Sequence, residues 1–300
     1  MKLVVRADDF GFTKIYNEGL MKTIDHGIVT TVDLMLDTPG LEDACERIKK
    51  CPWISVGWHT HFWWKPVLSA WKVSSLVDET TGRFKSGLSN RNDVDYDEAV
   101  AECRAQVQQC IRLLGKAPDT TDLNGTSVFD NARKQVCDEY GIIYHFAEKH
   151  MKSPHIASDA NCRFEETKVV GPSEAYRDLD IYFPTDLFSL KAVHQDSAAC
   201  FMMNYDPVQY YREDPDHMRD HKVAVMPWHP GYLDDFMVEV YDNPLLNAAR
   251  PLDIRALCSD AIKEWIRENR IELVNYRDAI FGTCEYQNHL KAIGSDLAVR

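Results

Sequence analysis

The sequence contains no CxxC motif, and its nine cysteines are an odd number scattered along the chain. We therefore expect reduced thiols and no disulfide framework. No run approaches the roughly 18 apolar residues of a membrane span. The N-terminus lacks a basic segment ahead of a long apolar stretch, and a strand starts at once, so no signal peptide is expected. These absences predict a cytoplasmic protein that does not enter the membrane.

Positive charge is also in short supply. Lysine and arginine number 34 against 47 aspartate and glutamate, and the formal net charge is -13. Such a surface repels phosphate backbones, so a nucleic-acid partner is not expected, and a neutral or cationic substrate fits better. The 45% share of hydrophobic residues and 27% share of charged residues are typical of a globular chain and exclude a disordered one.

Short apolar runs alternate with helical patterns along the 300 residues. This alternation is typical of a parallel sheet with helical crossovers, and the number of strands favours a (β/α) barrel over an open sheet. We predict a single α/β domain over 1–300, a TIM-like barrel with seven or eight mostly parallel strands. An aromatic-rich segment near 62–92 has no clear period and is expected to be an inserted loop. Strands are predicted at 3–5, 28–36, 54–57, 119–123, 141–146, 180–183, 223–226 and 271–274, and helices at 15–26, 41–50, 100–114, 132–140 and 254–269.

Polar residues follow several of these strands at their carboxyl ends, where barrels place their catalytic groups. The first strand ends in two adjacent carboxylates, and histidines or amides follow others. The residues are Asp8 and Asp9, His59 and His61, Asp122 and Asn124, and His229. Two neighbouring carboxylates resist joint ionisation unless a cation lies close, and neutral imidazoles are the commonest companion ligands of a metal ion. This pattern predicts a divalent-metal site that supports hydrolysis, with a carboxylate as base and a histidine as acid.

Each residue type also has a structural explanation. Asp8 and Asp9 can cap a helix, and Asn124 beside Gly125 can belong to a turn. His61 can be an ordinary polar residue of the aromatic loop, and His229 can cap the Pro-Trp-His-Pro-Gly turn. The tryptophans near these strand ends either pack in the core or stack on sugar rings at a pocket mouth, and both interpretations stay open. They are Trp58, Trp63, Trp64 and Trp228.

Six segments, in this order and spacing, resemble the YdjC-like carbohydrate deacetylase family, which includes chitooligosaccharide deacetylases. They are ADDFG at 7–11, GIVTT at 27–31 with LM at 34–35, VGWH at 56–59, GKAP at 115–118 with Asp122, HPGY at 229–232 and IELVNYRD at 271–278. The resemblance implies a distorted (β/α) barrel and a divalent-metal enzyme that removes acetyl groups from N-acetylated sugars. It also implies that Asp8 is the general base, that Asp9 and His59 bind the metal, and that His229 is the general acid or orients the leaving amine.

The chain departs from the family pattern at two positions. Asn124 stands where the family has a metal-binding histidine, and Asp37 stands where it typically has asparagine. An amide oxygen is a harder donor than imidazole and favours Mg²⁺ over Zn²⁺, so the identity of the one expected metal ion, Mg²⁺ or Zn²⁺, stays open. His61 is a candidate to replace the missing histidine. Trp58, Trp63, Asp122 and Trp228 are candidates for binding the sugar.

The leading hypothesis is a metal-dependent hydrolase that deacetylates an amino sugar or a short oligosaccharide. A glycoside hydrolase on the same barrel is an alternative, but it needs two carboxyl groups roughly 5 to 9.5 Å apart across a pocket. Asp8 and Asp9 are expected to point to opposite sides of their strand and so are unsuited to that pair. A second alternative is a metal-free sugar-binding or inactive relative. A homodimer stays open, with the aromatic loop after His61 as a candidate contact.

Overall fold

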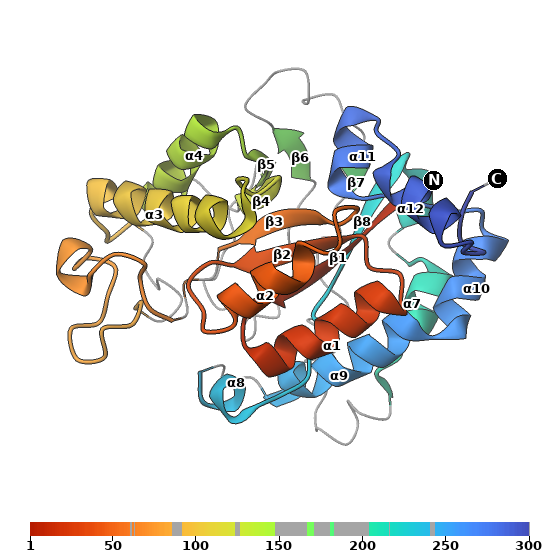
Figure 1. The fold of residues 1–300 in the computed structure, drawn as a ribbon, viewed down its shortest axis with the longest axis horizontal. Coiled ribbons are helices and arrows are strands. Elements are labelled where there is room, and N and C mark those ends of the chain that lie inside the picture. Colours follow the sequence, from red (N-terminus) through yellow and green to blue (C-terminus); the bar gives the residue numbers. More distant parts are fainter. Residues whose placement is uncertain are drawn as a thin grey trace.

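The computed structural model describes residues 1–60, 62, 64–85, 92–123, 127–147, 167–170, 181–182, 204–215, 217–240 and 244–299. Strands and helices alternate over most of this length (Figure 1). The strands are β1 Lys2–Phe10, β2 Thr31–Met35, β3 Ser55–His59, β4 Thr120–Leu123, β5 Ile143–Ala147, β6 Thr167–Val170, β7 Ile181–Tyr182, β8 Val223–Trp228 and β9 Glu272–Leu273. The helices are α1 Lys14–Asp25, α2 Leu41–Ile48, α3 Tyr96–Leu114, α4 Val128–Tyr140, α7 Pro207–Glu213, α8 Asp235–Val240, α9 Pro244–Cys258, α10 Asp260–Glu268, α11 Tyr276–Phe281 and α12 Glu285–Ala292, with short 3-10 helices at Ala70–Lys72 and Met218–Asp220.

The strands form one sheet in the order β6-β5-β4-β3-β2-β1-β8-β7, with β9 paired to the start of β1. All pairs are parallel except β5 with β6, which run antiparallel. The end strands β6 and β7 have Cα atoms within 8 Å of each other, so the sheet curls into a nearly closed barrel. This arrangement confirms the predicted α/β fold with a mostly parallel sheet.

Two details differ from the sequence-based expectation. The barrel has an antiparallel strand, β6, between the strands expected at 141–146 and 180–183, where no strand was predicted. The helix expected over 254–269 is two helices, α9 and α10. They separate at Ser259, whose side chain accepts a hydrogen bond from the backbone N–H of Ile262 and so caps the second helix.

Strand β1 shows how the sequence places polar groups inside the barrel. Leu3, Val5 and Ala7 belong to the large core between the sheet and its helices. Because side chains alternate along a strand, Val4 faces the other way and packs in a small cluster with Val225, on the inner side of the barrel. Arg6 and Asp8 share the face of Val4. The interior of the barrel is therefore apolar near the start of β1 and charged near its end.

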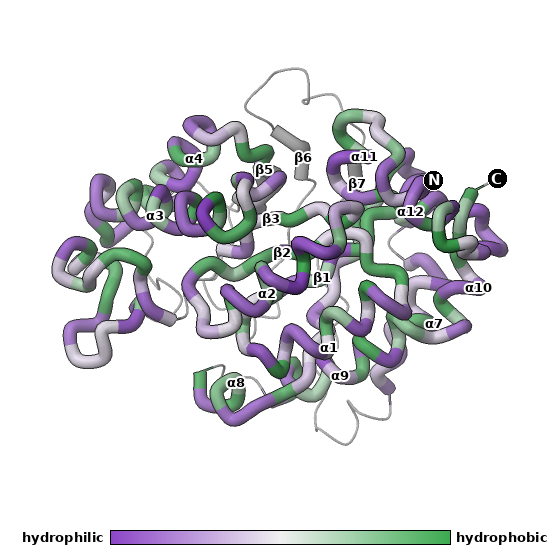
Figure 2. The backbone as a smooth tube through the Cα atoms, in the orientation of Figure 1, coloured by the Kyte–Doolittle hydropathy of each residue, from purple (hydrophilic) through white to green (hydrophobic). Residues whose placement is uncertain are grey.

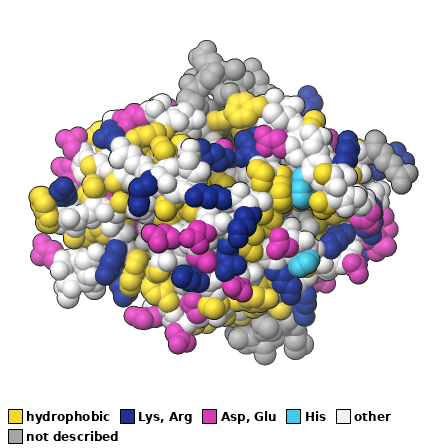
Figure 3. Space-filling view, in the orientation of Figure 1, with side chains coloured by type: hydrophobic (Ala, Val, Ile, Leu, Met, Phe, Trp, Pro, Cys, Tyr) yellow, Lys and Arg dark blue, Asp and Glu magenta, His cyan; other side chains and the backbone are white. Residues whose placement is uncertain are grey.

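The helices cover the outside of the sheet. In Figure 1, α2 lies in front of β1 and β2, and α1 lies beside α2 with α9 packed along it, while α3 and α4 pack together beside β3 and β4. Figure 2 shows hydrophilic and hydrophobic residues alternating along these outer helices, as expected where one side meets a core and the other meets water. Acidic and basic side chains are interspersed on the face shown in Figure 3.

The aromatic segment expected as an insert places a few apolar side chains, such as Val73 and Phe84, in the core where the structure describes it. Between 64 and 85 it contains the 3-10 helix Ala70–Lys72 and a bridge between Val77 and Phe84, and it forms the orange lobe at the left of Figure 1. The carboxylate of Glu102 on α3 accepts hydrogen bonds from the backbone N–H groups of Val67 at 2.9 Å and Leu68 at 3.1 Å. This buried side chain ties the insert to the barrel.

Among the described residues, no helix has the length and apolar character that crossing a bilayer requires. The cysteines at 45, 51, 103, 110, 137, 258 and 284 are free thiols.

Candidate functional site

The tip of β1 carries both carboxylates of the pair Asp8 and Asp9 into one site. The pairing of β1 with β2 shifts between Ala7 and Phe10, which marks a bulge, and Asp9 has a φ of 64°. A left-handed residue interrupts the alternation of side chains, so Asp9 does not turn away from Asp8 as a regular strand would require. The expectation that the two carboxylates point to opposite sides of the strand is wrong for this reason. Both reach the surroundings of His59, and both are buried.

Arg6 holds Asp8 in position from two residues earlier on the same strand. Its Nε and Nη2 atoms donate to the two carboxylate oxygens of Asp8 at 2.7 and 2.9 Å. Its Nη1 atom donates to Asp122 on β4 at 2.7 Å, and its Nε lies 3.5 Å from Asp33 on β2. One guanidinium therefore joins carboxylates from three strands, and its two parallel bonds to Asp8 leave that side chain little freedom.

Asp9 lies between a histidine and a second arginine. Its Oδ1 atom is 3.0 Å from Nε2 of His59, and Nη1 of Arg250, on α9, donates to its Oδ2 at 2.6 Å. Burial opposes ionisation of Asp9, but Arg250 and His59 outweigh it and hold the pKa of Asp9 well below its usual range. Burial likewise opposes a charged His59, yet the carboxylates of Asp9, Asp8 and Asp33 raise its pKa to about 9. The surrounding carboxylates therefore favour a positive charge at the position of His59.

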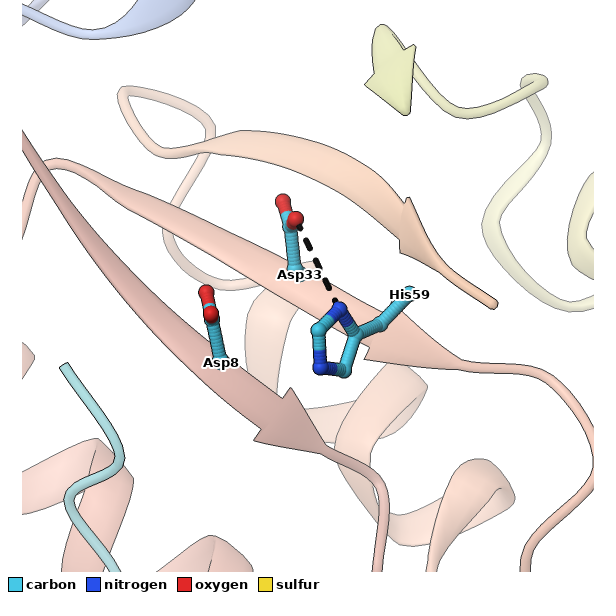
Figure 4. A group of neighbouring side chains, drawn as sticks. All are labelled: Asp8, Asp33 and His59. Atoms are coloured by element: carbon cyan, nitrogen blue, oxygen red, sulfur yellow. Dashed lines mark ion pairs between the residues drawn. The ribbon is translucent and has the colours of Figure 1, made fainter. Parts of the chain in front are cut away.

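Asp33 is a site residue that the sequence analysis missed. It lies on β2, and Figure 4 shows it pointing to the same side as Asp8 on β1 and His59 at the end of β3. One ligand atom from each of these three side chains lies within 4.8 Å of the other two. Burial, opposed by Arg6, raises the pKa of Asp33 to about 7. A carboxylate in the middle of the apolar run TVDLM is the sequence signal that could have identified it.

His229, at the end of β8, faces the same carboxylates. Its Nε2 atom is 4.0 Å from Oδ2 of Asp8. Its backbone N–H donates to Asp253 of α9 at 3.1 Å, and the hydroxyl of Tyr205 donates to the other oxygen of Asp253. Burial lowers the pKa of His229 to about 4, although Asp9 and Asp8 oppose the shift. The side chain is therefore a neutral imidazole at neutral pH, next to the carboxylate predicted to act as a base.

The Gly231 position in the HPGY motif allows helix α1 to approach the site. A Cβ atom on Gly231 would lie 2.0 Å from the ring of Tyr16, so only glycine leaves room for that ring. The hydroxyl of Tyr16 donates to the backbone oxygen of Asp8 at 3.0 Å and accepts from Nη1 of Arg250 at 3.1 Å. Tyr16 thus connects the backbone of the β1 tip to Arg250, the partner of the Asp9 carboxylate. Sequence reasoning did not identify Tyr16, Arg6, Arg250 or Asp253, because nothing local marks a residue whose partners lie far away in the chain.

The remaining predicted residues separate into three groups. Asp122 joins the site through Arg6, and 28% of its side chain is exposed. Trp58 and Trp228 are buried: Nε1 of Trp58 donates to Gln106 on α3, and Trp228 packs against Tyr211. Both rings pack in the core of this structure, and their role in binding a sugar stays a prediction. His61, Trp63 and Asn124 lie outside the described residues.

The chemistry of the donor set fits a divalent metal ion. Ion pairs link four carboxylates to two guanidinium groups in the described part of the site, which leaves two negative charges when both histidines are neutral. Without a metal ion, protons on His59 and Asp33, whose pKa values are raised to about 9 and about 7, can offset these two charges, and a divalent cation could balance them in place of those protons. Asp9 Oδ1 and His59 Nε2 lie 3.0 Å apart, within the roughly 2.8–3.6 Å expected between adjacent ligands that are about 2.0–2.2 Å from one ion. His59 is shared by two candidate donor sets, one with Asp9 and one with Asp8 and Asp33.

Comparisons with known proteins give a consistent result. The family described as YdjC-like protein matches residues 2–268. Carbohydrate deacetylase 2 of Listeria innocua serovar 6a is 25% identical over 286 residues, covering 93% of this chain and 98% of that protein. Chitooligosaccharide deacetylase of Proteus mirabilis is 31% identical over 121 residues, covering 40% of this chain and 47% of that protein. A crystal structure of a proposed cellobiose-phosphate cleavage protein from Enterococcus faecalis V583 superimposes on this chain with a TM-score of 0.65 at 18% identity. The superposition covers 93% of this chain and 98% of that one, which shows a shared fold.

Proposed function

The chain belongs to the YdjC-like protein family, and from this premise we propose that it is a metal-dependent carbohydrate deacetylase. The reaction would release acetate from an N-acetylated amino sugar or short oligosaccharide. The observation that supports this most directly is the meeting of Asp8, Asp9, His59 and His229 at the carboxyl ends of β1, β3 and β8. Relatives named as carbohydrate deacetylases match the chain over most of its length.

Asp9 and His59 would hold the metal ion. Their donor atoms lie 3.0 Å apart, and Arg250 keeps Asp9 ionised, as a ligand carboxylate must be. Asn124 and His61 stay candidates for a further ligand. When bound, a divalent ion polarises the acetyl carbonyl and lowers the pKa of water from about 15.7 to about 7. The mixed imidazole and carboxylate donors suit Zn²⁺ or Mn²⁺, and an oxygen-rich completion of the set suits Mg²⁺.

Asp8 is placed to act as the general base. Arg6 fixes its carboxylate with two hydrogen bonds, and a carboxylate positioned in this way can take a proton from an attacking water molecule. His229 is 4.0 Å away and is neutral, so it must first gain a proton before it can act as an acid. We propose that the proton taken by Asp8 passes through His229 to the sugar nitrogen while the bond between the acetyl carbon and nitrogen breaks. The products are then acetate and a free amine.

The test is an assay of acetate release from N-acetylglucosamine oligomers. The purified protein would be stripped with a chelator and then supplied with Mn²⁺, Mg²⁺ or Zn²⁺. We expect activity only with added metal and a loss in kcat of about 10²–10⁴-fold in Asp8→Asn, because general base catalysis contributes that much. Asp25→Asn, an exposed carboxylate on α1, is the matched control and should keep full activity. Activity that ignores both the chelator and Asp8→Asn would reject the proposal. Sugar binding without acetate release would identify a binding protein instead.

A further inference from the structure

The ring of His59 lies between two carboxylates. Its Nε2 atom is 3.0 Å from Oδ1 of Asp9, and its Nδ1 atom is 3.9 Å from Oδ2 of Asp33. The two nitrogens lie on opposite edges of the imidazole. An ion bound to Nε2 therefore lies on the edge of the ring away from the carboxylate that is near Nδ1. In Figure 4, a dashed line joins the carboxylate of Asp33, on the neighbouring strand β2, to the near edge of the ring. Asp33 therefore meets His59 from the side away from Asp9.

A neutral imidazole carries one N–H and one lone pair, and the group that accepts the N–H decides which nitrogen can bind a metal. A carboxylate near Nδ1 favours the tautomer with the proton on Nδ1. The lone pair of Nε2 is then available on the side of Asp9. Histidine ligands of metals almost always have such a partner, and its loss commonly weakens metal binding about 10–100-fold.

Asp33 is buried and constrained for this contact. Its side chain is 2% exposed, and within the described residues its Oδ1 atom has no hydrogen-bond partner. Burying a carboxylate with so few hydrogen bonds costs free energy, so packing alone does not account for it. Strand β3 makes room for it: a Cβ atom on Gly57 would lie 2.0 Å from Oδ1 of Asp33. Arg6 lies 3.5 Å from the other oxygen, which keeps that oxygen on the side of His59.

We infer that Asp33 is a positioning residue that orients His59 through Nδ1 and presents Nε2, beside Asp9, to a divalent cation. The inference deepens the proposed function because it rests on the metal role of His59. It assigns no metal contact to Asp33 itself. The role of Gly57 follows from it, since any side chain at that position would displace the Asp33 carboxylate.

The test measures the binding of Mn²⁺ alone, without substrate, to chelator-treated protein by calorimetry or by the spin resonance of free Mn²⁺. We expect Asp33→Val to raise the dissociation constant about 10–100-fold, because the carboxylate beside Nδ1 is lost. Asp33→Asn should lose much less, since its amide oxygen can occupy the position of Oδ2. Thr31→Val, at an equally buried polar residue two positions earlier on β2, is the matched control and should bind Mn²⁺ as the wild type does.

Gly57→Ala should displace the Asp33 carboxylate from His59 while Asp33 itself is retained. It should weaken Mn²⁺ binding in the wild type and have little further effect when combined with Asp33→Val, because both changes remove the same contact. Circular dichroism of each variant would show that the fold is retained.

Three results would overturn the inference. They are unchanged Mn²⁺ affinity in Asp33→Val, an equal and complete loss of binding in Asp33→Asn and Asp33→Val, and a wild type that binds no Mn²⁺. The second result would make Asp33 a direct ligand, as the grouping with Asp8 allows. A failure of this inference can be distinguished from a failure of the proposed function. A protein that binds Mn²⁺ with this dependence on Asp33 but releases no acetate would support the positioning role and reject deacetylation.

Discussion

Replacing Arg250 by methionine would remove the cation that compensates a buried carboxylate. The side chain of Arg250 is fully buried, and its Nη1 atom donates to Asp9 at 2.6 Å and to Tyr16 at 3.1 Å. Breaking a buried ion pair by removing one partner costs about 3–5 kcal/mol, because the other charge stays buried. At roughly 2–4 °C per kcal/mol for chains of about this size, the melting temperature should fall by roughly 6–20 °C.

The same variant should respond to metal more strongly than the wild type. A divalent ion beside Asp9 would replace part of the positive charge that Arg250 supplied. Binding to the folded state stabilises it by about 2.7 kcal/mol when the free ion is at 100 times its dissociation constant. We therefore expect Mn²⁺ to raise the unfolding free energy of Arg250→Met by more than it raises that of the wild type.

Urea unfolding in chelator and in Mn²⁺ is the suitable assay. Arg104→Met is the matched control, because Arg104 makes a comparable pair of bonds to Glu139 at 2.9 and 2.7 Å on the surface. Exposed ion pairs contribute about 0–1 kcal/mol, so that variant should stay close to the wild type. Adding Asp9→Asn to Arg250→Met should recover part of the lost stability. The reasoning is refuted if Arg250→Met costs no more than Arg104→Met, or if Asp9→Asn recovers nothing.

Three further perturbations examine how the barrel supports the site. Gly231→Ala should cost about 1–3 kcal/mol in a thermal unfolding scan, because its Cβ would displace the ring of Tyr16, and an unchanged melting temperature would contradict this. Trp58→Phe should lose roughly 1–3 kcal/mol of stability and leave KM unchanged, whereas a large rise in KM would show that Trp58 contacts substrate. Burial raises the pKa of Glu102 from the ordinary 4.5 to about 7, so its ionisation opposes folding as the pH rises through that range. Glu102→Gln should therefore show a smaller loss of urea-unfolding free energy between about pH 5 and about pH 8 than the wild type, and equal losses would argue against it.

Local patterns in the sequence predicted those parts of the site that lie at strand ends. The apolar run before Asp8 and Asp9 and the short runs before His59 and His229 mark the ends of β1, β3 and β8. Parallel strands bring their carboxyl ends to one rim, so residues that follow different strands can be expected to meet there. The proximity of Asp9 and His59 could be anticipated on this basis, and the structure places their side-chain atoms 3.0 Å apart.

Local patterns in the chain were sufficient to predict the alternation of strands and helices, the parallel sheet that follows from it, and the rim where the polar residues gather. These features depend on periodicity and turn chemistry within a few residues. The three-dimensional fold alone established that Asp8 and Asp9 both reach His59, with Asp9 in a left-handed conformation, that Arg6 and Arg250 pair with these carboxylates, and that Asp33 lies beside the ring of His59. A bulge depends on the register with the next strand, and a buried charge pair depends on residues up to 241 positions apart, so neither has a local signal in the chain.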